Sequence, residues 1–138
     1  MLAIRCFRIA GIYLLVGMGI GIAMGATGNF ALLPLHAHVN LLGWVGLAIF
    51  GGVFRLWPAL AETRLAQVSF WAYNLALPVV LASLARLLLG HTDALPVMAA
   101  GELAVFAAAV MFVACLFLPA SRASDAPATL RRQLARVS

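Results

Sequence analysis

The chain has very little charge, and it contains no lysine. Only 9% of its 138 residues are charged and 65% are hydrophobic, whereas soluble domains carry roughly 25% charged residues. This composition excludes an ordinary water-soluble domain and indicates an integral membrane protein surrounded by membrane lipid. Four apolar stretches are each long enough to cross a bilayer: residues 9–28, 35–57, 68–89 and 95–118. Their short connections predict one domain, 1–138, folded as an all-α, up-and-down bundle of four transmembrane helices.

Because lysine is absent, all nine basic residues are arginines, and their positions predict the orientation of the bundle. Except for Arg86, they precede the first span, flank the connection between the second and third spans (Arg55 and Arg64), or follow the fourth. The positive-inside rule then places both termini in the cytoplasm of a cell with an inner membrane, and segments 29–34 and 90–94 on the outer, periplasmic side. The net charge of +5 comes from these span ends and from a short basic tail at about 121–138. Without a basic stripe with interleaved aromatics, we expect no nucleic-acid partner.

Cysteine and acidic residues are also scarce. The two cysteines, Cys6 and Cys115, fall near the cytoplasmic ends of their spans and form no CxxC pair, which excludes a disulfide framework and argues against a thiolate metal site. The chain has four carboxylates and none of the motifs typical of nucleophilic catalysis or phosphate binding. An enzymatic role therefore has little support from the sequence.

The most informative residues are two histidines, His36 and His38, at the outer end of the second span. Residues two apart on an α-helix point to nearly opposite sides, because each step turns the chain by about 100°. The two imidazoles are therefore expected to serve different sites, one on each flank of the helix. Imidazole at membrane depth is costly without a ligand or polar partner. Gly43 and Gly46 lie two turns below the two histidines and leave room for a flat ring, although they also suit plain helix packing.

Other polar residues are expected at the same end of the bundle. Arg86 lies near the outer end of the third span, and its guanidinium suits the carboxylate of a cofactor, such as a haem propionate. The alternative is an ion pair between Arg86 and Glu102 that joins the third and fourth spans. His91 is either a ligand or a solvated loop residue. Trp44, on the His36 side, either contacts a bound ring or packs in the interface or core.

The first span carries glycines at four-residue intervals, Gly17, Gly21 and Gly25. This spacing places three small residues on one helix face, where a neighbouring backbone can approach closely. The partner is either another span of the same chain or a second subunit.

The run HAHVNLLGWVGLAIFGG, residues 36–52, resembles the haem-ligating helices of subunit I of the haem–copper oxidases and nitric oxide reductases. Its HVNLL portion is similar to the segment around a low-spin haem ligand in the reductases. The whole HxH run resembles the tenth helix of the oxidases, in which the first histidine binds the high-spin haem and the second binds the low-spin haem. The resemblance covers one helix of four. The chain lacks a counterpart of the copper-binding histidines and their adjacent tyrosine, which argues against reduction of oxygen or nitric oxide.

Subunit I of that family has twelve helices in three arcs of four, and this chain resembles one arc. The resemblance implies a homotrimer, with a dimer as the other option, in which each haem b lies between His36 of one subunit and His38 of the next. Such a cytochrome transfers electrons or senses redox state, with a quinol or a redox protein as partner. Two alternatives stay open: a copper- or zinc-binding protein that uses His36, His38 and His91 at the outer face, and a non-catalytic assembly subunit. The expected cofactor-binding residues are His36, His38, Arg86, Gly43, Gly46 and Trp44.

Overall fold

The computed structural model describes residues 1–117, and these residues form helices and turns without a strand. Four helical stretches are long and apolar enough to cross a membrane, so the protein has the composition and build of a multi-pass membrane protein. The second stretch is divided into three consecutive helices. In chain order the elements are α1 (Leu2–Thr27), α2 (Leu33–His38), the π-helix η1 (Val39–Gly46), α3 (Leu47–Leu56), α4 (Pro58–Ala61), α5 (Arg64–Leu88), the 3₁₀ helix η2 (Thr92–Ala94) and α6 (Leu95–Leu116).

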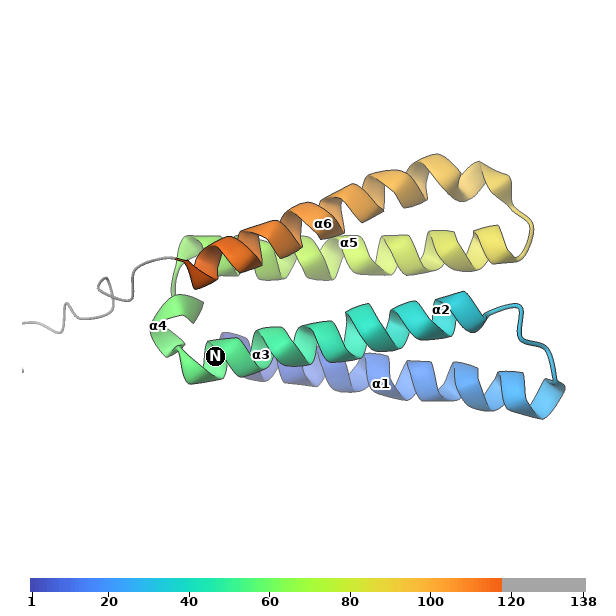
Figure 1. Ribbon diagram of the computed structural model, residues 1–138, viewed down its shortest axis with the longest axis horizontal. Coiled ribbons are helices and arrows are strands. Elements are labelled where there is room, and N and C mark those ends of the chain that lie inside the picture. The colour runs from blue at the N-terminus through green and yellow to red at the C-terminus, as the bar shows by residue number, and fades with distance from the viewer. Residues whose placement is uncertain (118–138) are drawn as a thin grey trace, which may run out of the picture.

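The four spans run alternately up and down, as the sequence predicts. Figure 1 shows the N-terminus, α4 and the end of α6 at one end of the bundle, and the turns before α2 and α6 at the other. Arg5, Arg8, Arg55 and Arg64 belong to helix segments at the first end. We call this the arginine end, and the opposite end the histidine end. The basic tail at 121–138 lies outside the described residues, and the orientation in the membrane stays a prediction.

Two helices begin earlier than the hydropathy pattern indicates. Helix α1 starts at Leu2 rather than at residue 9, because Arg5 and Arg8 are good helix formers and extend the apolar helix into a polar end. Helix α5 starts at Arg64 rather than at residue 68. Its N-cap is Thr63, whose hydroxyl accepts a hydrogen bond of 3.2 Å from the Ala66 amide.

The bundle consists of two helical hairpins, α1 with the second span and α5 with α6 (Figure 1). Aromatic rings join the hairpins: Phe50 of α3 stacks on Phe112 of α6 with ring centroids 3.7 Å apart, and Phe50 also contacts Tyr73 of α5. Within the second hairpin, the buried Ser69 hydroxyl donates a 2.8 Å hydrogen bond to the Ala108 carbonyl. The aromatic core thus lies toward the arginine end, away from the histidines.

Candidate functional site

His36 lies in α2 with its imidazole against α1. Its Nδ1 is 2.8 Å from the carbonyl oxygen of Gly17, and its ring is partly buried. A Cβ atom added at Gly21 would come within 2.9 Å of the imidazole Cε1, whereas nothing lies within 4 Å of such an atom at Gly25. Two of the three glycines in the α1 stripe therefore make room for the second span of the same chain. The third faces open space.

Asn40 completes this contact, although it is not among the site residues that the sequence predicts. Its side-chain amide donates a 2.8 Å hydrogen bond to the carbonyl of His36, one turn earlier. The same amide lies over Gly17, where an added Cβ would be 2.6 Å from Oδ1. The available signal was the spacing, because a polar residue four positions after His36 shares its face of the helix. Asn40 and His36 together fill the slot above the α1 glycines.

His38 has a different environment. Its side chain is exposed, and its Nδ1 lies 2.8 Å from the carbonyl of Pro34, four residues earlier in the same helix. This hydrogen bond orients the ring without joining it to another helix. The two histidines thus diverge as the helical spacing predicts, His36 toward α1 and His38 onto the surface of the bundle.

The hydrogen bonds determine the tautomer of both imidazoles. A carbonyl oxygen only accepts hydrogen bonds, so the proton of each neutral ring must be on Nδ1. The lone pair is then on Nε2. Metal-ligating histidines commonly have this arrangement, in which one ring nitrogen donates to a carbonyl and the other is available to the metal. Both side chains are therefore pre-oriented as Nε2 ligands.

The second span continues from His38 into η1, eight residues of π-helix. Runs of this kind are rare and often occur at functional sites. Gly43 packs against the ring of Tyr13 from α1, and an added Cβ at Gly46 would be 3.0 Å from the Tyr73 hydroxyl. That hydroxyl also donates a 3.1 Å hydrogen bond to the carbonyl of Leu42. Within this chain, tyrosines of α1 and α5 occupy the space beside both glycines.

We call the space on α1 that holds His36 and Asn40 the histidine slot. The remaining predicted site residues lie apart from it. Trp44 is partly buried and packs against the core. Arg86 forms an ion pair of 2.9 Å with Asp93, in which both side chains are largely exposed. The alternative of an ion pair between Arg86 and Glu102 is not what the structure shows, since the turn after α5 brings Asp93 to the arginine. His91 is exposed in that turn, and Glu102 is exposed on α6.

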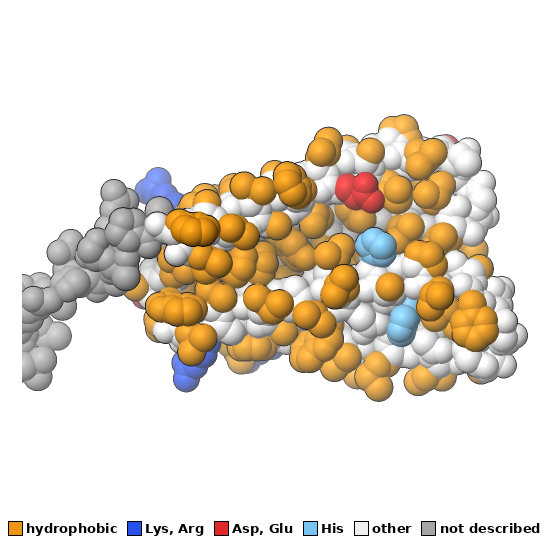
Figure 2. All heavy atoms as spheres, in the orientation of Figure 1, with side chains coloured by type: hydrophobic (Ala, Val, Ile, Leu, Met, Phe, Trp, Pro, Cys, Tyr) orange, Lys and Arg blue, Asp and Glu red, His pale blue; other side chains and the backbone are white. Residues whose placement is uncertain are grey.

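One face of the molecule gathers the polar groups of the spans near the histidine end. Figure 2 shows two histidine side chains as separate patches on this face and an acidic side chain over α6, all among hydrophobic side chains. Among residues 1–117, no group of three His, Cys, Asp or Glu side chains is close enough to hold a metal ion.

Comparison with known proteins gives no relative. No family model, no curated protein and no solved structure matches the chain. The resemblance of residues 36–52 to the oxidase and reductase helices stays a prediction that rests on those residues.

Proposed function

We propose that the protein is a haem b-binding membrane protein in which His36 and His38 supply axial ligands to iron. One observation supports this most strongly: both imidazoles are held through Nδ1 by backbone carbonyls, which leaves both Nε2 atoms able to coordinate a metal. The residues present therefore fit the group. When bound, haem supplies a one-electron redox centre, while the histidines orient it and set its potential.

His38 distinguishes this proposal from a purely structural role for the histidines. The His36 hydrogen bond joins two helices and would suit a structural or assembly subunit equally well. Within residues 1–117, His38 makes no hydrogen bond to another helix: it is exposed, and its one hydrogen bond is to the Pro34 carbonyl of its own helix. An oriented imidazole on the apolar surface of a bundle is unfavourable unless something outside the chain binds it.

A haem shared between subunits follows from the divergence of the two rings. His36 contacts α1, whereas His38 faces away from the helix on the bundle surface. Side chains that leave a helix in different directions are not placed to bind the same iron from both sides, but in a ring of identical subunits each completes a neighbour's site. Glu102 supports such an interface, because a carboxylate exposed toward lipid is costly and a neighbouring subunit would cover it. We propose a trimer, which resembles the three arcs of oxidase subunit I.

The surrounding residues have supporting roles in this proposal. Arg86 contacts Asp93 through one guanidinium nitrogen, so its other N–H groups can hold a propionate. Trp44 would contact the edge of the haem ring. Gly43 and Gly46 let Tyr13 and Tyr73 pack closely against the second span. Two imidazole ligands would leave a bound iron without an open position, so the site suits electron transfer or redox sensing rather than oxygen chemistry. In the proposed orientation, the histidine end faces the periplasm.

The test is an absorption spectrum of the purified protein, reduced and oxidised. We expect a b-type spectrum that His36→Ala and His38→Ala each abolish or convert to that of five-coordinate iron. The matched control is His91→Ala, which removes the third histidine from an exposed turn and should leave the spectrum unchanged. Metal analysis runs in parallel, because copper or zinc without a Soret band would favour the metal-binding alternative. A protein that takes up no haem, or a His38→Ala variant with the wild-type spectrum, would contradict the proposal.

A further inference from the structure

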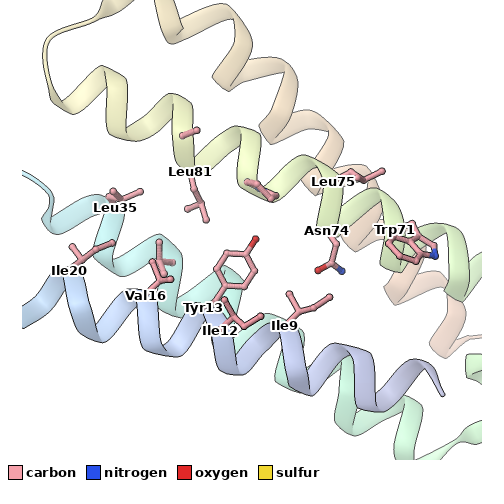
Figure 3. Close-up of a pocket in the computed structure, with 13 residues that line it drawn as sticks. Ile9, Ile12, Tyr13, Val16, Ile20, Leu35, Trp71, Asn74, Leu75 and Leu81 are labelled. Carbon is pink, nitrogen blue, oxygen red and sulfur yellow. The ribbon is translucent and has the colours of Figure 1, made fainter.

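A groove of about 620 Å³ lies between α1 and α5, and the histidines do not line it. Figure 3 shows Tyr13 directed into this space from α1, and Asn74 directed into it from α5. Apolar side chains form most of the remaining wall. Trp71 and Leu75, at the rim, are at least half exposed, so the groove is accessible from the lipid. Its volume and its mostly apolar lining are those of a small-molecule site, which typically measures roughly 300–1,000 Å³.

The amide of Asn74 is only half satisfied. Its Nδ2 donates a 2.8 Å hydrogen bond to the Phe70 carbonyl of the same helix, but its buried Oδ1 has no hydrogen-bond partner. Inside a bilayer no bulk water supplies the missing donor, and an unpaired buried acceptor costs roughly 1–3 kcal/mol. The Oδ1 atom is covered by neighbouring atoms, so a donor placed in the groove reaches it only when a nearby side chain moves aside.

We propose that the groove binds the ring of a membrane quinol, with one quinol hydroxyl donating to Asn74 Oδ1. The second hydroxyl, at the far side of the ring, is matched by the Tyr13 phenol on the opposite wall. Tyr13 and Trp71 offer aromatic surfaces to a flat ring. The open, lipid-facing rim accommodates an apolar tail. A simple aliphatic alcohol meets only one of these features, because it has one hydroxyl and no ring.

This inference names a donor class for the proposed cytochrome, but binding itself does not require haem. The groove and the histidine slot share α1: Tyr13 lies one turn from Gly17, whose carbonyl holds His36. No groove residue is a histidine, and neither His36 nor His38 lines the groove. Each site can therefore be removed while the other is kept.

The experiment measures binding of radiolabelled decylubiquinol to the full chain in nanodiscs, corrected for partition into empty nanodiscs. Asn74→Leu should weaken binding about 10-fold, and Tyr13→Phe, which removes only the hydroxyl, roughly 3-fold or more. The matched control is Gln67→Leu, which makes the same amide-to-alkyl change two turns earlier on α5 and outside the groove. It should bind as the wild type does. The dimethyl ether of the quinol has the same ring and tail but no hydroxyl to donate a hydrogen bond. The wild type should bind this ether as weakly as the Asn74→Leu variant binds the quinol.

Several results would overturn the inference. If the dimethyl ether bound as tightly as the quinol, the groove would bind apolar molecules without selecting for a hydrogen-bond donor. If dodecanol bound as tightly as the quinol, the groove would be assigned to hydroxylated lipids. No saturable binding at all would indicate that a neighbouring subunit covers it. The double variant His36→Ala/His38→Ala should still bind quinol, while Asn74→Leu should keep any haem spectrum. A failure of haem binding is thereby distinguishable from a failure of quinol binding.

Discussion

At the scale of single residues, the site depends on missing side chains as much as on the histidines. Gly17 and Gly21 of α1 leave the slot that receives Asn40 and His36. The carbonyl of Gly17 is accessible to the imidazole because no side chain shields it. A glycine in a membrane helix thus acts as part of a ligand's support, since it fixes where the ring lies and which nitrogen carries the proton.

Gly21→Ala tests this support. The added methyl would lie 2.9 Å from the His36 ring, so either the imidazole or the helix must move. We expect a loss of roughly 1–3 kcal/mol in the free energy of unfolding, together with reduced haem content. Unfolding in mixed micelles and the Soret absorbance per chain measure the two effects. The controls are Gly19→Ala and Gly25→Ala, where nothing lies within 4 Å of the new methyl. If all three variants behave alike, the slot does not position His36.

The partner of Arg86 shows what sequence patterns leave open at this scale. An arginine in one span and a carboxylate in the next predict an ion pair, and Glu102 is the carboxylate within the adjacent span. The structure pairs Arg86 with Asp93 instead. A turn through Gly90, with φ at 95°, places Asp93 beside the end of α5. Which carboxylate is reached depends on the path of a short loop, and neither charge nor hydropathy encodes that path.

At the scale of elements, the second span is the unusual one. A π-helix has poorer packing along its axis than an α-helix, so it persists only where neighbours stabilise it. Here the hydroxyl of Tyr73 reaches from α5 to the Leu42 carbonyl, and Tyr13 of α1 packs against Gly43. Both neighbouring helices therefore contact η1, immediately after the histidines.

Tyr73→Phe should loosen η1 while keeping the aromatic contact with Phe50. Because only the hydrogen bond to Leu42 is lost, we expect a loss of about 1 kcal/mol in the free energy of unfolding. Amide hydrogen exchange should become faster within residues 39–46, and it should be unchanged in α6. The matched comparison is Ser69→Ala, which removes the hydrogen bond to Ala108 and should act on the α5–α6 hairpin instead. Unaltered exchange in η1 would mean that Tyr73 does not hold the π-helix.

Elements differ in how far the sequence predicts them. Four spans follow from apolar length alone, because a bilayer requires long helices and the chain has four suitable runs. The π-helix does not follow: the run VNLLGWVG reads as ordinary apolar helix, and its register depends on contacts with Tyr13 and Tyr73. The α1 glycine stripe predicts close packing but not the partner. That partner became evident only when the fold placed His36 and Asn40 above it.

At the scale of the whole molecule, each chain supplies one histidine to each of two proposed haem sites. His36 and His38 leave the second span in different directions, and Glu102 is exposed on α6. These features predict an assembly that closes on itself, with each subunit contributing one ligand to each neighbour. A mass measurement that includes bound detergent distinguishes a trimer from a dimer, but it does not show which chains share a haem.

Mixing of variant subunits answers that question. A His36→Ala chain keeps His38, and a His38→Ala chain keeps His36, so neither alone forms a bis-histidine site. If each haem lies between His36 of one subunit and His38 of the next, co-expression in equal amounts should restore about a quarter of the wild-type bis-histidine haem spectrum, because random assembly makes that share of the junctions complete. The control replaces one partner by the double variant His36→Ala/His38→Ala, mixed with either single variant, which leaves no complete junction. If both histidines of one chain served one haem, co-expression would restore none, and the shared-site arrangement would be wrong.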